Sequence, residues 1–195
     1  MQAHAGRSTV HTGGEVHVSS GEGTATSSGA ITIRSVNAGA AGTSGYLSFS
    51  SGSSVTGNSG YIHMGTGVAT AGRGGMVLIS VGSGTSSVGG MVQAHAGRST
   101  VHTGGAVVVT SGEGTATSSG VVLIRSSNSG EAGVSGSLLF SSGTSVTGNS
   151  GRVHMGTGAA TAGRGGAVVV TVGSGTSGSG GLVQAHAGRS TVHTG

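Results

Sequence analysis

The sequence predicts an all-β protein, a parallel β-solenoid (β-helix) of about 13 stacked 15-residue coils. Three observations lead to this fold class. Glycines recur at a nearly constant spacing, short apolar alternations follow them, and β-branched residues are common while Pro is absent. Pro removes a ladder hydrogen bond and is excluded from central strands, so its absence suits a chain of paired strands.

The composition is unusual for a globular domain, because 45 of 195 residues are Gly and only 6% are charged. Gly and Ser at this level are typical of linkers or disorder. Disordered chains, however, are highly charged and poor in β-branched residues, whereas this one is rich in Val, Ile and Thr. Ordered β structure is therefore favoured. Collagen is excluded, since Gly does not recur at every third residue.

The first element of each repeat is a predicted strand that follows a boundary glycine. The boundary glycines are 15 residues apart, with two steps of 16, and each follows Gly or Ser. Val16-His17-Val18 shows the apolar spacing of two that is typical of a strand. The same pattern recurs at 31–33, 47–49, 62–64 and 77–79. The boundary glycines are Gly14, Gly29, Gly45, Gly60, Gly75, Gly90, Gly105, Gly120, Gly136, Gly151, Gly166 and Gly181.

The second element is a smaller predicted strand after a second glycine near the middle of the repeat. Examples of this strand are 23–26 and 69–71. Glycines at both bends would supply the backbone conformations of sharp corners. Stacked coils would then bury the apolar columns against small residues such as Ala69 and Ala160. The mid-repeat glycines are Gly21, Gly52, Gly67, Gly82, Gly97, Gly112, Gly143, Gly158, Gly173 and Gly188.

A longer period lies over the short one. Residues 2–13 recur at 93–104 and 184–195, an offset of 91 residues or six repeats. We therefore expect one continuous solenoid over 1–195, with blocks at approximately 1–91 and 92–182 and a third that starts at 183–195. At about 4.8 Å per coil the rod would be roughly 60 Å long.

Two features test the predicted assembly. Arg7 and Glu22 occupy equivalent places one repeat apart, as do Arg98 and Glu113, so each pair is expected to form an ion pair between stacked coils.

The residue between the two apolar positions is polar in most repeats of the first block. In the second block it is apolar at Val108, Leu123, Leu139 and Val169. Strands that are apolar on both faces are normally covered on both sides, which indicates lateral packing against another copy.

The sequence shows no constellation for catalysis, metal binding or cofactor binding. It contains no Cys, Lys or Asp, and its nine His and four Glu are scattered. We therefore expect no enzyme, no cofactor and no small-molecule substrate. The net charge of +4 is thinly spread and the aromatic residues are few, so nucleic acid is not an expected partner. No apolar run is long enough to span a membrane, so insertion is not expected.

A file of Thr residues favours one alternative function, ice binding. Antifreeze solenoids present flat arrays of Thr in paired files, and one such file is present here, although Val55 and Val146 interrupt it. A second file is missing. The Thr residues are Thr24, Thr70, Thr85, Thr100, Thr115, Thr161, Thr176 and Thr191.

The pattern Ser/Gly-Gly-x-Φ-x-Φ-x-x-Gly, where Φ is apolar, resembles the Gly/Ser/Thr-rich β-solenoid stalks of large extracellular fibre proteins and phage-type tail-fibre shafts. The resemblance implies a structural rod outside the cell or on a cell or virion surface. We expect it to stack end to end and to bundle side by side, with itself as partner. A shaft of a trimeric adhesin or tail fibre is a further alternative. Viral triple spirals, however, usually alternate apolar residues through both halves of the repeat, and this chain does not.

Overall fold

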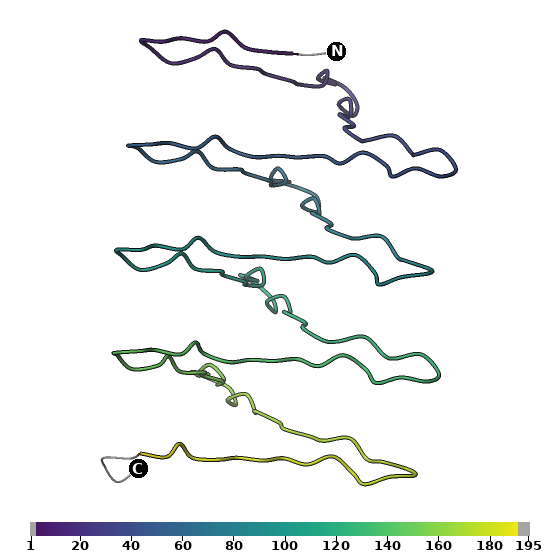
Figure 1. Ribbon diagram of the computed structural model, residues 1–195, viewed down its shortest axis with the longest axis vertical. Helices are drawn as coiled ribbons and strands as arrows, with labels where there is room; N and C mark the ends of the chain where they lie inside the picture. Colours follow the sequence, from purple (N-terminus) through teal and green to yellow (C-terminus); the bar gives the residue numbers. More distant parts are fainter. Residues whose placement is uncertain (1–2, 191–195) are drawn as a thin grey trace. The chain divides into compact units, whose positions relative to one another are not determined.

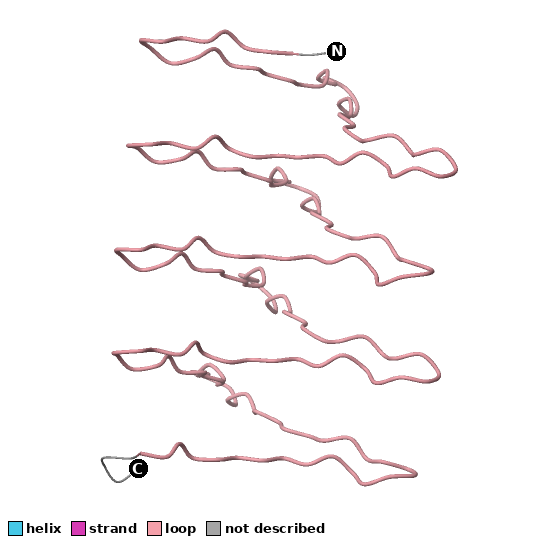
Figure 2. Cartoon of the chain, viewed as in Figure 1, coloured by secondary structure: helices cyan, strands magenta, loops and turns pink. Residues whose placement is uncertain are grey.

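The computed structural model describes residues 3–190, and this part of the chain contains no helix and no β-strand. Figure 2 shows the backbone as loop throughout. The predicted β-solenoid is therefore wrong for the single chain. Extended backbone becomes a strand only when a neighbouring segment supplies ladder hydrogen bonds. The alternation of apolar residues indicates an extended segment but does not say which segment is its partner.

Each 15-residue repeat consists of one extended segment and one closed loop. The segment from Gly14 to Gly21 is extended, and the loop from Gly21 to Gly29 follows with a bend at 24–26. Figure 1 shows the chain crossing itself at the base of such loops, most clearly at the left-hand edge. The two glycines of a repeat thus meet at one crossing instead of forming two separate corners.

The predicted second strand is also wrong, because its residues form the bend of the loop. Residues 24–26 and 70–72 bend, and so do the corresponding residues of the other repeats. Ala69 and Ala160, expected to pack inward, are exposed. This half of the repeat consists mostly of Ser, Thr, Gly and Ala, which favour turns or leave little apolar surface to bury.

The chain forms two compact units, Met1–Ala94 and His95–Gly195. In the first unit every third loop lies on the same side. The bends at 9–11 and 55–57 lie at the left of Figure 1, and those at 40–41 and 85–87 at the right. The bends at 24–26 and 70–72 lie between them, where the chain is drawn as small curls. One turn therefore contains three extended segments and three loops.

The second unit repeats this winding. Its bends at 100–102 and 146–148 share one side, and those at 131–133 and 176–178 share another. Within the first unit, equivalent bends are 46 residues apart (55 − 9) or 45 apart (85 − 40). The 91-residue block equals one turn of each length, 45 + 46. The 91-residue block therefore corresponds in length to two turns.

Neither unit has a hydrophobic core among the described residues. No described residue is buried, and all the large apolar side chains are solvent-exposed. The chain exposes 19537 Å². A folded monomer of the same mass, 18.1 kDa, exposes roughly 8,000 Å². Hydrophobic burial thus contributes little to the structure of a single copy.

Candidate assembly surface

The loop bases are held by a recurrent backbone hydrogen bond. In six repeats the N–H of the boundary glycine donates to the C=O of the mid-repeat glycine eight residues earlier. The donor–acceptor distance is 2.8 Å between Gly14 and Gly6, and 2.9 Å between Gly120 and Gly112. Each loop is therefore closed locally, without help from another segment. The closed loops are 6–14, 21–29, 82–90, 97–105, 112–120 and 173–181.

Side-chain hydroxyls close or stiffen several other loops. Ser35 Oγ donates to Gly45 O over 2.8 Å, and Thr157 Oγ1 donates to Gly166 O over 3.2 Å. Inside the loop, Ser54 Oγ accepts a hydrogen bond from Gly57 N at 3.0 Å. Ser and Thr commonly make such bonds to nearby backbone groups in turns. The abundance of Ser and Thr in this half of the repeat thus has a local structural reason.

The crossing at the loop base explains the boundary glycines. A Cβ at any of the twelve would lie 2.9–3.4 Å from the Cβ of the residue that precedes the mid-repeat position. The tightest case is Gly75 against Thr66, at 2.9 Å. A Cβ on a mid-repeat glycine such as Gly67 would meet nothing within 4 Å. No described glycine has a positive φ, so the expected role of glycine in unusual backbone conformations is wrong. The boundary glycine is needed for space.

The sequence contains a signal for this difference that the glycine spacing alone does not reveal. The mid-repeat glycine is replaced by Val36 and Ser127 in the two 16-residue repeats, whereas the boundary glycine is present in all twelve. A position that is never replaced within one chain points to a steric requirement. A position that accepts Val does not.

The extended segments expose both their backbone edges and their apolar side chains. The backbone hydrogen bonds described for residues 3–190 close the loops, apart from one from Gly42 N to Gly39 O, and none joins one extended segment to another. The side chains alternate along each segment: Val122 is 45% exposed, Leu123 72% and Ile124 58%. Unpaired edges of this kind are templates for pairing with other chains. These segments form a candidate assembly surface.

The predicted ion pairs are absent within the chain. Arg7 forms no ion pair with Glu22, and Arg98 forms none with Glu113. Arg7 lies in the loop 6–14 and Glu22 in the next loop, and successive loops lie on different sides of the winding. Their equivalence in the repeat is real, but it does not make them neighbours in one copy.

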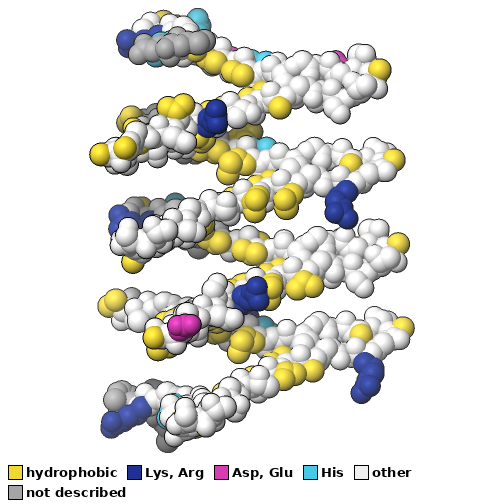
Figure 3. Space-filling model, turned by 90° about the vertical axis from the view of Figure 1, so that its right-hand side faces the viewer, with side chains coloured by type: hydrophobic (Ala, Val, Ile, Leu, Met, Phe, Trp, Pro, Cys, Tyr) yellow, Lys and Arg dark blue, Asp and Glu magenta, His cyan; other side chains and the backbone are white. Residues whose placement is uncertain are grey.

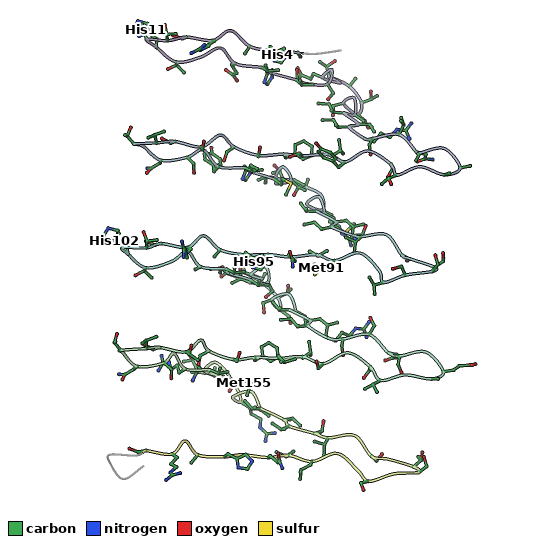
Figure 4. The ribbon with its side chains drawn as sticks, in the orientation of Figure 1. His4, His11, Met91, His95, His102 and Met155 are labelled. Carbon is green, nitrogen blue, oxygen red and sulfur yellow. The ribbon has the colours of Figure 1, made fainter. Side chains whose placement is uncertain are left out.

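The described residues show no metal site. They contain no group of three or more His, Asp or Glu that could hold a metal ion. In Figure 4, His11 and His102 lie at the ends of their loops, whereas His4 and His95 lie on the straighter parts of the chain. A hollow of about 350 Å³ is lined by the consecutive residues 34–37 of one 16-residue repeat. Among the residues described, no helix is long and apolar enough to cross a membrane.

The Thr residues of the expected file lie in or beside the loop bends. Thr24 and Thr70 share one side of the first unit, whereas Thr85 belongs to a loop on another side. The file is therefore divided among different sides of the winding. Thr191 and His193 lie outside the described residues.

Comparison with protein-family models, with curated proteins and with solved structures finds no match for this chain.

Proposed function

We propose that the protein is structural and forms a fibre or filament from copies of itself. The observation that carries this proposal is the open state of the extended segments between Gly14 and Gly181, which have unpaired backbone edges and exposed apolar columns. A regular row of such segments gains hydrogen bonds and apolar burial only by meeting other segments. Association with further copies supplies both.

The remaining properties support a structural role and give no support to chemistry. The exposed surface carries few charges, and its side chains converge on no metal or substrate site among the described residues. From the resemblance to extracellular stalks and tail-fibre shafts, we propose that the fibre lies outside the cell or on a cell or virion surface. Ice binding gains no support from the structure, because the Thr residues of one copy are split between loops on different sides.

Electron microscopy and fibre diffraction of the purified protein test this proposal. We expect filaments or rods with an axial reflection near 4.8 Å, the spacing of hydrogen-bonded neighbouring segments. Six such layers give a weaker repeat of about 29 Å for the 91-residue block. Small particles that do not elongate at any concentration would contradict a fibre-forming role.

A further inference from the structure

The space between successive turns is the most informative feature of each unit. In Figure 3 the turns appear as separate bands with hydrophobic side chains along them. Leaving aside His4 and Ser190, the hydrogen bonds of the described part join residues two to ten positions apart, which is less than one repeat. One turn spans 45 or 46 residues, so no hydrogen bond of this set connects one turn to the next. The turns follow each other regularly, but the atoms of the chain do not fill the space between them.

The number of repeats in a turn indicates what fills this space. A turn contains three equivalent repeats, each with one segment and one loop. A second and a third copy, rotated by one third and two thirds of a turn about the winding axis, would therefore follow the same path between the turns of the first. Closed cyclic symmetry is the usual arrangement of identical subunits. Each side of the assembly would then present segments from the three copies in strict alternation.

The exposed area supports such extensive contact. The single copy exposes 19537 Å², about 11,000 Å² more than a folded monomer of its mass is expected to show. Obligate interfaces bury roughly 2,000–5,000 Å² or more in total, so contact at one patch would leave most of this excess exposed. Interleaving along the whole length covers every extended segment on both edges.

The charges agree with the register of this arrangement. After rotation by one third of a turn, a given repeat of one copy lies one layer from the next repeat of its neighbour. Arg7 of one copy would then lie beside Glu22 of another, and Arg98 beside Glu113. Opposite charges that one chain keeps apart are therefore brought together between copies. The same register places the apolar positions of neighbouring repeats, such as Val16 and Ile31, in one column.

We propose that three copies of the chain wind around a common three-fold axis, with the extended segments of two copies occupying the space between successive turns of the third. This inference deepens the proposed fibre function, since it names the partner and the geometry of the assembly. In this arrangement residues 15 positions apart are neighbours only when they belong to different copies. Residues 46 positions apart lie three layers apart within one copy, which is about 14 Å at the usual spacing.

Disulfide cross-linking distinguishes neighbours within one copy from neighbours in different copies. Introduced Cys pairs can be used for this, because the natural chain contains no Cys. In His17→Cys/Thr32→Cys the two positions are 15 residues apart and lie between the apolar columns. Adjacent paired segments bring Cα atoms about 4.8 Å apart, within the range for a disulfide. We expect oxidation to give a covalent trimer of about 54 kDa, three times 18.1 kDa, on a denaturing non-reducing gel.

The matched control is His17→Cys/His63→Cys, whose positions are 46 residues apart and lie on the same side of successive turns. These positions are too far apart for a disulfide in the interleaved trimer, so we expect no trimer band. A monomer with an internal disulfide between positions 17 and 32 would overturn the proposal, since the repeats of one chain would then stack on each other. An open-ended ladder of multiples would overturn it as well, because the ring of three would not close.

The mass of the unmodified protein gives a second readout that does not depend on the substitutions. Mass per unit length, measured by scanning transmission electron microscopy, should equal three chains for every two block lengths, because each chain of 195 residues spans about two 91-residue blocks. A value of one chain for that length would contradict interleaving. Trimers that never elongate would leave the three-fold winding intact and refute the fibre function. Filaments that form without the cross-link between positions 17 and 32 would support the fibre function and refute the three-fold winding.

Discussion

At the scale of the residue, glycines in three different environments look the same in the sequence. The boundary glycine lets two parts of the backbone cross at the loop base, and the mid-repeat glycine faces open space. A third kind begins the bend: a Cβ on Gly114 would collide with the carbonyl of Ser118 and lie 2.9 Å from Thr117 O. The local environment, more than the residue type, decides which glycines can be replaced.

Two substitutions in one loop test this distinction. We expect Gly114→Ala to destabilise the assembled protein by about 1–3 kcal/mol, because the methyl group overlaps with backbone atoms that cannot easily move. Gly112→Ala, two residues earlier, meets nothing within 4 Å and should change stability by less than about 0.5 kcal/mol. Thermal unfolding followed by circular dichroism would compare the two. Equal melting temperatures would show that the backbone does not approach Gly114 this closely.

At the scale of the element, each loop is a closed local structure that needs no partner. In six loops a backbone bond joins the two ends, and in three others a side-chain hydroxyl does so. In four loops a Ser accepts a hydrogen bond from a backbone N–H of the bend. The extended segments are the opposite case, since their backbone groups find no partner segment in the described part of the same chain. The loops are therefore defined by their own sequence, whereas the segments would be completed by the proposed assembly.

The hydrogen bond from Gly57 N to Ser54 Oγ can be tested in isolation. In Ser54→Ala the Gly57 amide loses its acceptor, and a bond of this kind contributes about 0.5–1.5 kcal/mol. We expect hydrogen exchange at Gly57 to become about two- to tenfold faster. Ser53→Ala is the control, because Ser53 makes no such bond. If both variants exchanged at the same rate, the hydroxyl would not hold the bend.

The contrast between locally closed loops and unpaired segments also explains which elements could be predicted from the sequence. The 15-residue repeat, the 91-residue block and the extended segments at positions such as 16–18 could be identified, because glycine spacing and apolar alternation act locally. The second strand at 23–26 could not, because short runs of Thr and Ala suit a bend as well as a strand. The stacking of coils failed for a different reason, since periodicity does not say whether the next layer belongs to the same chain or to another.

At the scale of the whole molecule, the two blocks differ in the residue between the apolar columns. This position is exposed and apolar in most repeats of the second block, with Leu139 82% exposed and Leu123 72%, although His154 occupies it in one repeat. Its equivalents in the first block, Ser48 and Thr32, are polar. The difference between the blocks supports the predicted side-by-side packing of fibres, which would involve the second block more than the first.

We expect Leu123→Thr/Leu139→Thr to reduce lateral bundling, because it removes apolar surface while keeping residues that suit extended backbone. The length of single filaments should stay the same, since the backbone edges are unchanged. Filament width in negatively stained micrographs is the measurement. The matched control, Thr32→Ser, changes a side chain that is already polar and should leave the width unaltered. Bundles of normal width in the double variant would contradict lateral packing through this column.

The closed loops also have a mechanical consequence. Each loop such as 21–29 stores eight residues of chain behind one backbone hydrogen bond of 2.9 Å. Fully extended, eight residues span about 26–29 Å. A rod under tension could therefore open one loop at a time and lengthen without breaking a covalent bond, and each loop could close again when the load is removed. In a fibre exposed to shear, the Gly-rich half of every repeat would act as a reserve of extensible length.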